Sequence, residues 1–385
     1  MRIALFNWRS VLSSNAGGAE VHLYEIFNRI AEKNQVYLIA SCNNMRVTKN
    51  ELTIGNLHVF HITRKELLYP LFSLRLLPRV LTRKFDIIIE DDSKVPIIWP
   101  LIMSRLLSMP FVLIIHHVHG KTLFEEFPST VAYVVYLYEL TMLKLYAHFN
   151  PYVVTVSEST KKELKTLGFQ EDKISIVYNA VSKPSGEPSR VKSSDPLVVY
   201  VGRVKTYKRL EHLVQAIKNI PQARLAIAGK GDNKVYANLV VLVRELGLES
   251  RVKLIGEVTE EEKRSILQEA WVYVATSMKE GFGICVLEAQ AYGVPVVAYN
   301  VPGLSESVKN GCSGLLVSDC DIDGLSKAIS VLLQDQALRE RLSRGAVEYS
   351  GCFNWTRSAR EFLHLIDQIT RQNLPKRVRS EQANS

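Results

Sequence analysis

The chain has 385 residues, of which 47% are hydrophobic and 23% charged, and its formal net charge at pH 7 is +9. This length suffices for two domains, and the composition is that of a globular α/β protein rather than of a disordered or fibrous chain. No run of about 18 uncharged apolar residues is present, which argues against a transmembrane helix. No recognisable nucleic-acid-binding module accompanies the basic charge, so we expect no nucleic-acid partner.

The amino terminus and the cysteines indicate the compartment. Arg2 begins an apolar strand directly, without the apolar region and cleavage site of a signal peptide. The five cysteines are odd in number and form no C-x-x-C pair, which is typical of free thiols in a reducing environment. We therefore expect a cytoplasmic protein.

The first half alternates apolar strands with helices. Gly17 and Gly18 lie at the turn between the first strand and a helix over residues 16–31. A glycine pair there lets a ligand approach the backbone closely, although a plain tight turn would show the same residues. Residues 124–149 predict a tyrosine-rich helix that is either buried or faces an acceptor or a membrane. Strands are predicted at 2–6, 36–40, 57–62, 85–90, 111–115, 152–156 and 174–178.

Residues 64–84 combine apolar and basic side chains. Pro70 and Pro78 divide the apolar run into short pieces, and Arg75 and Arg79, four positions apart, are expected on one helix face. The pattern is typical of an interfacial segment on an anionic membrane surface, and a core-packing helix with solvated arginines is the alternative. The six basic residues are Arg64, Lys65, Arg75, Arg79, Arg83 and Lys84.

Two acidic clusters look like metal-ligand patterns. Residues 90–92 read Glu-Asp-Asp at the end of a strand, and residues 319–323 contain two overlapping D-x-D patterns before a helical run. Acidic residues are favourable at the start of a helix. We interpret the first cluster as a solvated loop or cap and the second as a cap, and we predict no metal site.

Three histidines follow the predicted strand at 111–115. If the segment is extended, His117 and His119 lie on one side and His116 on the other. Histidines at the carboxyl end of a parallel strand favour acid–base or ligand-binding roles. Local backbone partners are the alternative, and the sequence nominates no further ligands that would complete a metal site.

The second half begins after residues 182–195, a linker with two prolines, a glycine and five serines and no periodicity. Arg203 follows the first strand of the new sheet, and Lys208 begins its first helix. Two cations at such a turn suit a diphosphate, although ordinary surface charge would give the same pair. Strands are predicted at 196–201, 223–228, 252–255, 271–275, 294–299 and 311–317.

The stretch 279–307 carries the most specific pattern: strand, glycine loop, helix, strand. The Gly-Phe-Gly loop at 281–283 and the helix that follows it suit a phosphate, because glycine amides and a helix N-terminus both favour anions. Glu280 precedes this loop, and Glu288 lies two turns into the helix. A carboxylate at either place can accept hydrogen bonds from sugar hydroxyls, and two solvated glutamates beside a glycine turn are the alternative.

This stretch, KEGFGICVLEAQAYGVPVVAYNVPGLSES, resembles the signature of the retaining family-4 glycosyltransferases, which have the GT-B fold. The resemblance implies that Glu280 contacts the donor sugar and that Glu288 binds the ribose of the nucleotide. It also implies that the amides of Gly281, Phe282 and Gly283 hold the diphosphate.

The resemblance extends to other positions of the second half. The R-x4-K spacing of Arg203 and Lys208 matches the two family cations that stabilise the leaving nucleoside diphosphate in place of a divalent cation. The backbone at Gly256 and Glu257 matches the turn that reads the nucleobase.

The first half resembles the family more weakly. Gly17 and Gly18 match a glycine pair that lines the donor phosphate and the acceptor side of the cleft. His116 matches a histidine near the donor sugar, which leaves His117 and His119 as acceptor-site candidates. Which of the three histidines lines the donor sugar stays open.

The fold that the resemblance implies is α/β, of GT-B type, with two doubly wound parallel-sheet, Rossmann-like domains facing across a cleft. The expected bounds are 1–181 for an acceptor-binding domain, 182–195 for the linker, 196–353 for a donor-binding domain, 354–372 for a helix that crosses back, and 373–385 for a disordered basic tail.

The expected activity is retaining transfer of a sugar from a nucleoside-diphosphate donor, with no metal or other cofactor. The expected acceptor is a sugar or polyprenyl-linked glycan on a membrane lipid, met by a protein that is peripheral on the cytoplasmic membrane face. Transfer to a soluble sugar or small molecule, a non-catalytic sugar-nucleotide binding protein, and a GT-B phosphorylase or epimerase are the alternatives. The sequence indicates neither the sugar, nor the base, nor the linkage.

Overall fold

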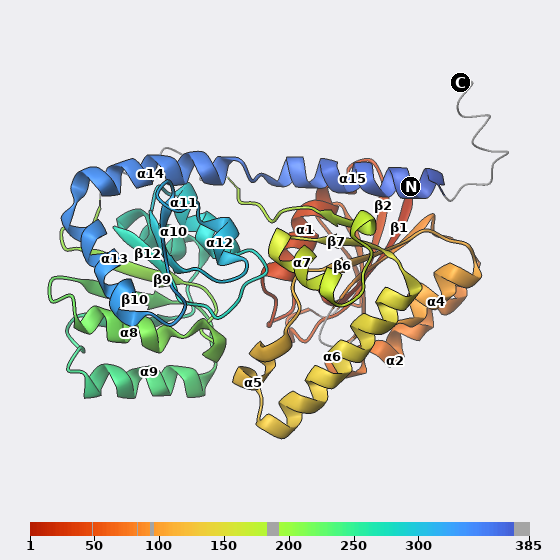
Figure 1. The fold of residues 1–385 in the computed structure, drawn as a ribbon. Helices are drawn as coiled ribbons and strands as arrows, with labels where there is room; N and C mark the ends of the chain where they lie inside the picture. Colours follow the sequence, from red (N-terminus) through yellow and green to blue (C-terminus); the bar gives the residue numbers. More distant parts are fainter. Residues whose placement is uncertain (48, 83, 93–95, 183–191, 373–385) are drawn as a thin grey trace. The chain divides into compact units, whose positions relative to one another are not determined.

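The computed structural model describes residues 1–47, 49–82, 84–92, 96–182 and 192–372. Most of the predicted linker, residues 183–191, and the whole predicted tail lie outside the described residues, as does Arg83 of the basic cluster. The chain divides into two compact units, each with one sheet (Figure 1). Unit 1 contains Met1–Val118, Val134–Asn179 and the chain from Trp355 onward, and unit 2 contains His119–Tyr133 and Ala180–Asn354.

The sheet of unit 1 has eight described strands in the order β3-β4-β2-β1-β5-β6-β7-β8. They are β1 (Arg2–Arg9), β2 (Gln35–Ser41), β3 (Glu51–Ile54), β4 (Leu57–Thr63), β5 (Ile87–Asp91), β6 (Phe111–Ile115), β7 (Tyr152–Thr155) and β8 (Ile174–Ile176). Neighbours pair in parallel except β3 with β4. β5 and β6 are buried throughout, as expected for parallel strands covered on both faces. A topological switch point falls between β1 and β5, where the chain order reverses.

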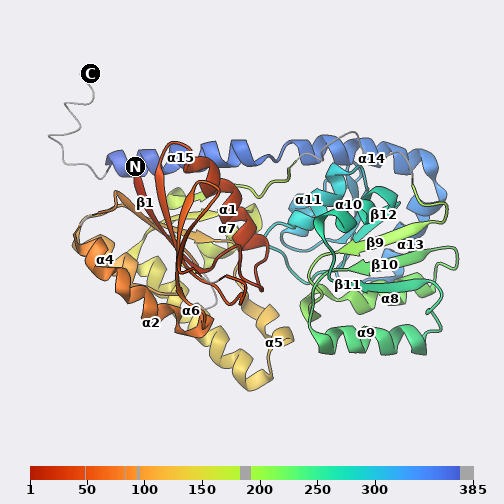
Figure 2. The ribbon, with the colours of Figure 1, turned by 180° about the vertical axis from the view of Figure 1, so that it is seen from behind.

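Helices cover both faces of this sheet. They include α1 (Gly18–Ile30), α2 (Tyr69–Ser73), α3 (Leu77–Leu81), α4 (Trp99–Leu106), α6 (Ser129–Phe149), α7 (Glu158–Thr166) and α15 (Trp355–Gln372). α1 and α15 lie side by side (Figures 1 and 2), with the rings of Phe27 and Phe362 5.1 Å apart. α2, α4 and α6 lie together away from that pair, and Trp99 Nε1 of α4 donates to Ser73 Oγ of α2 at 2.8 Å.

The basic segment is divided as its prolines predict, and this corrects one expectation. It forms the 3₁₀ turns η1 (Glu66–Leu68) and η2 (Leu74–Leu76) beside α2 and α3, and a proline occupies the first turn of each α-helix, where its missing N–H is tolerated. Arg75 therefore lies on η2 and Arg79 on α3, so their predicted placement on one helix face is wrong. Their guanidinium groups pack over Phe72 at 4.4 Å and Phe60 at 5.0 Å.

The sheet of unit 2 has six described strands, all parallel, in the order β11-β10-β9-β12-β13-β14. They are β9 (Leu197–Val201), β10 (Arg224–Ala228), β11 (Val252–Gly256), β12 (Val272–Ala275), β13 (Val296–Tyr299) and β14 (Gly314–Val317). From β9 the chain proceeds outward to β11 and then returns to β12 on the other side. In open parallel sheets ligands bind at the carboxyl ends of the strands that flank such a reversal, and here these are β9 and β12.

Some helices of unit 2 begin with a side-chain cap, as the second acidic cluster predicts for one of them. They include α5 (Leu123–Glu126), α8 (Leu210–Lys218), α9 (Asn233–Glu245), α10 (Glu260–Glu269), α11 (Ile284–Ala291), α12 (Leu304–Ser307), α13 (Ile322–Gln334) and α14 (Gln336–Gly351), together with the 3₁₀ turns η3 (Gly120–Thr122) and η5 (Thr206–Lys208). Thr259 and Glu262 form a capping box on α10. Asp321 accepts from Gly324 N at 2.8 Å at the start of α13, which confirms the second acidic cluster as a cap.

Candidate functional site

Two predicted residues meet at the switch point of unit 2. Lys208 ends η5 after β9, and its Nζ forms an ion pair with Oε1 of Glu280, which follows β12. Ser277 Oγ donates to the same oxygen at 2.6 Å. Burial lowers the pKa of Lys208, but the Glu280 carboxylate outweighs it and holds the pKa well above its usual range. The lysine is therefore a fixed positive charge beside Glu280.

Glu280 is held by a neighbouring loop that sequence reasoning did not single out. Its backbone N–H donates to Pro302 O at 3.1 Å. Gly303 has φ +82°, and a Cβ there would lie 2.2 Å from the carbonyl oxygen of Glu280, so only glycine permits this approach. The signal for this support was the Pro-Gly pair within the signature stretch.

The glycine loop supplies backbone rather than side chains. Gly283, with φ +92°, precedes the first residue of α11. Phe282 is buried, and its ring packs edge-on against Phe353 with the centroids 5.1 Å apart. A ligand contact by Phe282 must therefore come from its backbone.

Glu288 lies on α11 and pairs with a lysine of α10. Lys263 Nζ is 2.8 Å from Glu288 Oε1 and 2.9 Å from Glu260 Oε2. Burial raises the pKa of Glu288, and Lys263 opposes that rise. Lys263 was not predicted as a site residue, because nothing local in the sequence marks its partner 25 positions away.

The charged groups of this region all affect the pKa of one neighbouring side chain, the thiol of Cys285. Burial raises the pKa of the Cys285 thiol to about 12, and the charges that further shift it belong to Glu288, Lys208, Lys263 and Glu280. Both predicted donor-site glutamates and their lysines thus surround the start of α11. The arrangement offers two carboxylates for sugar hydroxyls and, at the end of the loop, a helix N-terminus for a phosphate.

Arg203, Gly256 and Glu257 lie in turns at the carboxyl edge of the same sheet. Arg203 follows β9 with an exposed side chain, and its carbonyl oxygen accepts from Tyr200 Oη at 2.8 Å. Gly256 ends β11, and its carbonyl oxygen accepts from Gly229 N at 2.6 Å. Glu257 is exposed and approaches Lys230 Nζ at 3.9 Å. All three are thus at the sheet edge where the ion pair of Lys208 and Glu280 lies.

In unit 1 His116 forms a buried pair with a carboxylate. Its Nε2 is 2.9 Å from Oδ1 of Asp91, the last residue of β5. Burial lowers the pKa of His116, but Asp91, together with Glu20 at the start of α1, outweighs it and raises the pKa. Of the three histidines, His116 is therefore the one that contacts a residue at the switch point of unit 1.

His22 is a functional-site neighbour that sequence reasoning missed. It is buried on α1, its Nδ1 lies 2.5 Å from Asn179 Oδ1, and its ring meets His116 edge-on with the centroids 4.9 Å apart. Burial and the charge of His116 lower the pKa of His22 to about 3, so it is neutral. The sequence feature that could have indicated His22 is its position one turn after Gly18, and such a histidine is too common to indicate a functional site.

The first acidic cluster is not a solvated loop, so that part of the prediction is wrong, and the helix start near residue 93 that it was also expected to cap lies outside the described residues. Glu90 is buried, and its Oε1 accepts from Tyr146 Oη at 2.5 Å and from Ile97 N at 3.1 Å. Burial raises its pKa to about 7. Asp91 is buried against His116, and the Asp92 N–H donates to Ile114 O at 2.8 Å. The turn at the end of β5 is therefore held by contacts in the protein interior and is not a solvated loop.

The remaining predicted residues of the first half are held by local contacts. Gly17 N donates to Glu20 Oε2 at 2.7 Å, and α1 begins at Gly18. His117 is half-buried, and the His119 carbonyl accepts from Thr122 Oγ1 at 2.8 Å at η3. In the described parts of the chain, no group of three or more His, Cys, Asp or Glu side chains is arranged to hold a metal ion.

Comparison with solved structures defines the fold. The chain is similar to sucrose-phosphate synthase from Thermosynechococcus elongatus, with a TM-score of 0.76 and 20% identity over 96% of this chain and 99% of that one. It is similar to HepE of Anabaena in complex with UDP, with a TM-score of 0.76 and 20% identity over 96% of this chain and 100% of that one. The fold is that of the GT-B glycosyltransferases, as predicted.

Two family models then identify the family. The model of Glycosyltransferase Family 4 matches residues 16–183, and the model of Glycosyl transferases group 1 matches residues 184–348. The chain belongs to glycosyltransferase family 4, which confirms the resemblance carried by the signature stretch.

Curated relatives match over part of their length. An uncharacterised glycosyltransferase of Methanocaldococcus jannaschii is 29% identical over 231 residues, 55% of this chain and 59% of the relative. The D-inositol 3-phosphate glycosyltransferase of Corynebacterium efficiens is 31% identical over 222 residues, 52% of this chain and 52% of the relative. The chain thus matches little more than half the length of these relatives.

Proposed function

We propose that this protein is a retaining glycosyltransferase that uses a nucleoside-diphosphate sugar and no metal ion. The observation that carries the proposal is the ion pair of Lys208 and Glu280 at the switch point of unit 2, beside the glycine loop. It combines a cation for the leaving diphosphate with a carboxylate for the donor sugar. Solved complexes of HepE with UDP and with UDP-glucose support the choice of donor.

Each part of the donor has a candidate partner in unit 2. The diphosphate is bound by the amides of the 281–283 loop and by Arg203 and Lys208, whose charges stabilise it as it leaves. The ribose is bound by Glu288, and the base is met by the backbone at residues 256–257. The sugar is contacted by Glu280.

In unit 1 the candidates for the sugar and the acceptor are His116 and the glycine pair. The charge that Asp91 imposes on His116 suits it to hold a sugar hydroxyl. Gly17 and Gly18 offer backbone to the donor phosphate or the acceptor. His117 is an acceptor candidate in unit 1, and His119, the first residue of a unit 2 segment, is another.

The proposed acceptor is a sugar carried on a membrane lipid, met by a protein that is peripheral on the cytoplasmic face. The 64–84 segment supports this proposal because five of its seven leucines are exposed, with Leu67 78% exposed. Arg64, Lys65, Arg75, Arg79 and Lys84 are also exposed. Exposed apolar and basic side chains together suit an anionic bilayer.

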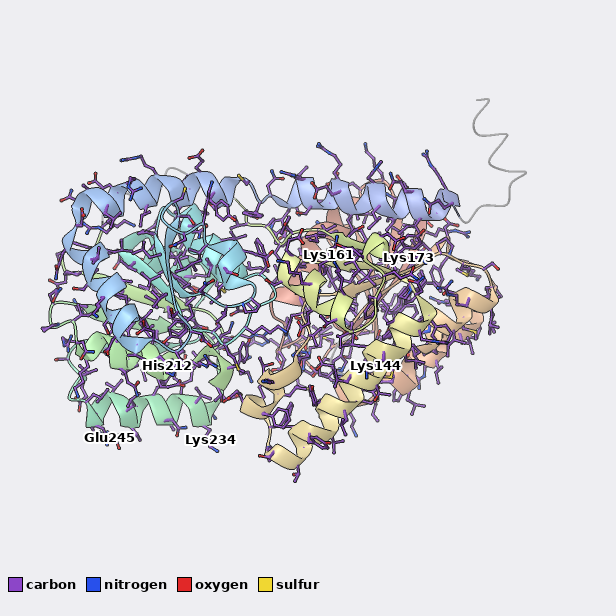
Figure 3. All side chains as sticks on the ribbon, viewed as in Figure 1. Lys144, Lys161, Lys173, His212, Lys234 and Glu245 are labelled. Atoms are coloured by element: carbon purple, nitrogen blue, oxygen red, sulfur yellow. The ribbon has the colours of Figure 1, made fainter. Side chains whose placement is uncertain are left out.

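The neighbouring helices of unit 1 extend this surface. Leu106 of α4 and Val134 and Leu137 of α6 are exposed apolar residues, and α4 and α6 lie beside α2 (Figures 1 and 2). Lys144 adds an exposed cation on α6 (Figure 3). In the described residues no helix is long and apolar enough to cross a bilayer. The attachment that we propose is by adsorption and shallow insertion of the exposed side chains.

The test is donor hydrolysis without acceptor across a panel of sugar nucleotides. We expect slow release of one nucleoside diphosphate, and we expect the sugar to be transferred with retention when a polyprenyl-phosphate-linked sugar in anionic vesicles is added. Free monosaccharides as acceptors test the soluble alternative. Binding of no sugar nucleotide would contradict the proposed activity, and an inverted product would contradict retention.

A further inference from the structure

Lys263 stands between two carboxylates of unequal exposure. Its Nζ contacts Glu288 and Glu260, but the Glu260 side chain is 88% exposed whereas those of Glu288 and Lys263 are 24% and 19% exposed. Ion pairs on the surface contribute little because water and salt screen them. The interaction with Glu288, which is largely removed from water, is therefore the one that decides where the lysine lies.

The stability of α10 does not explain this lysine. The helix already begins with the capping box of Thr259 and Glu262 and with three glutamates in its first turn. Lys263 follows them directly, near the positive end of the helix dipole, where a cation is disfavoured. Its ammonium group is also largely withdrawn from solvent, which is unfavourable unless the group is paired. The partner that offsets these costs is Glu288 on α11.

We propose that Lys263 is a positioning residue for nucleotide binding, which holds the Glu288 carboxylate through Oε1 so that Oε2 accepts hydrogen bonds from the ribose hydroxyls. This inference rests on the proposed role of Glu288 as the ribose ligand. It makes Lys263, which acts on the ribose through Glu288 and not by direct contact, a determinant of how strongly the protein distinguishes nucleotides with a ribose diol from those without one.

The groups around Glu288 define how the pair depends on pH. From α10 it faces Lys263 and Glu260, and Tyr273 of β12 and Cys285 of α11 are within its electrostatic reach. Burial raises the pKa values of Tyr273 and Cys285, so both are neutral. Lys263 is the group that lowers the pKa of Glu288 against burial. Removal of its charge raises that pKa further, and a protonated carboxyl accepts fewer hydrogen bonds.

The experiment compares binding of a nucleoside diphosphate and its 2′,3′-dideoxy analogue by calorimetry. The probe is whichever of UDP, ADP and GDP the full-length wild type binds. Lys263→Met should weaken binding of the ribonucleotide about 10-fold or more, as expected for loss of a hydrogen bond to a charged group. Binding of the dideoxy analogue should change by no more than about 2-fold. The loss of ribonucleotide affinity in Lys263→Met, relative to the wild type, should grow as the pH is lowered.

Two variants serve as controls for charge and for position. Lys263→Arg keeps the cation and should retain most of the discrimination, and Glu260→Gln removes only the exposed partner and should bind as the wild type does. Thermal unfolding of each variant checks the fold, and Lys263→Gln, a polar neutral residue, takes the place of Lys263→Met if that variant unfolds.

The outcomes separate this inference from the proposed function. If Lys263→Met weakens the binding of both nucleotides equally, or still distinguishes the two nucleotides as well as the wild type does, the positioning role of Lys263 is wrong. The ribose role of Glu288 then stands. If the wild type itself binds both nucleotides equally, the ribose role is wrong and the inference falls with it.

Discussion

Lys208 and Glu280, 72 positions apart in the chain, form a partly buried ion pair at the carboxyl edge of β9 and β12. Ser277 completes the pair by donating to the same carboxylate oxygen. Each charge thus neutralises the other. A bound diphosphate would offer the lysine a second anion, and the glutamate Oε2 would still be available to a sugar hydroxyl.

The two cations of this edge should be required for turnover. Arg203→Ala or Lys208→Ala should each lower kcat by about 10² or more, because the leaving diphosphate loses a stabilising charge. Lys205→Ala is the matched control, since Lys205 pairs instead with Asp232 on the surface. Steady-state rates with the donor found in the hydrolysis panel measure the effect. Unchanged kcat in both variants would remove the diphosphate clamp from the mechanism.

Activity should survive removal of divalent cations. In the proposed site Arg203 and Lys208 supply the positive charge that a metal would otherwise provide to neutralise the diphosphate. Rates are measured after dialysis against EDTA and again after addition of Mg²⁺ or Mn²⁺. Complete loss that either ion restores would show that a metal takes part and that an acidic cluster has been misassigned.

Glu288→Gln should raise KM for the donor more than it lowers kcat. The ribose lies away from the bond that breaks, so its contact contributes equally to the ground state and the transition state. The comparison is made at saturating acceptor. An effect confined to the KM of the acceptor would contradict the assignment to ribose.

Asp91→Asn should lower the pKa of His116. In the wild type Asp91 raises it above the ordinary 6.5 against the effect of burial. The stabilisation that this pair contributes is therefore fully present below about pH 6.5 and is lost as the pH rises through the folded-state pKa. NMR titration of the imidazole signals measures the shift, with His22, whose pKa is about 3, as the internal reference that stays neutral. An unchanged His116 titration in the variant would show that Asp91 does not set its charge.

The wild type should sediment with anionic vesicles, and salt should weaken this binding. Each basic residue near an anionic leaflet contributes about 1 kcal/mol, so Arg75→Glu/Arg79→Glu should reduce binding strongly. Leu67→Ser/Leu71→Ser should reduce the part that persists at high salt, because we propose that those exposed leucines insert into the bilayer.

The matched control for the membrane surface is Lys218→Glu/Lys234→Glu, which makes the same change of net charge on α8 and α9 of unit 2. Both lysines are exposed, and Lys234 lies on the outer side of α9 (Figure 3). If this control loses as much binding as Arg75→Glu/Arg79→Glu, the attraction depends on total charge and not on the 64–84 surface. Absence of wild-type binding to any vesicle would remove the support for a lipid acceptor.

Most of the fold was predictable because it is encoded locally. Continuous apolar runs such as Phe111–Ile115 become buried parallel strands, and Thr259 and Asp321 cap the helices that follow them. The edge strand β3 was not predicted: it has four residues and is only partly buried, so its pattern is weak. The family signature could likewise be recognised from one stretch, since a loop, a helix and a strand carry all of it.

The sequence by itself determined the two sheets, the helix caps, the membership of glycosyltransferase family 4 and the identity of the candidate residues. Only the tertiary structure decided their partners: Lys208 with Glu280, Lys263 with Glu288, and His116 with Asp91 and His22. It also buried the side chains of the acidic residues Glu90 and Asp91 in the protein interior. Strand and helix formation follow from neighbours along the chain, whereas burial, pairing and the pKa shifts that they cause depend on groups that only the packed sheets bring together.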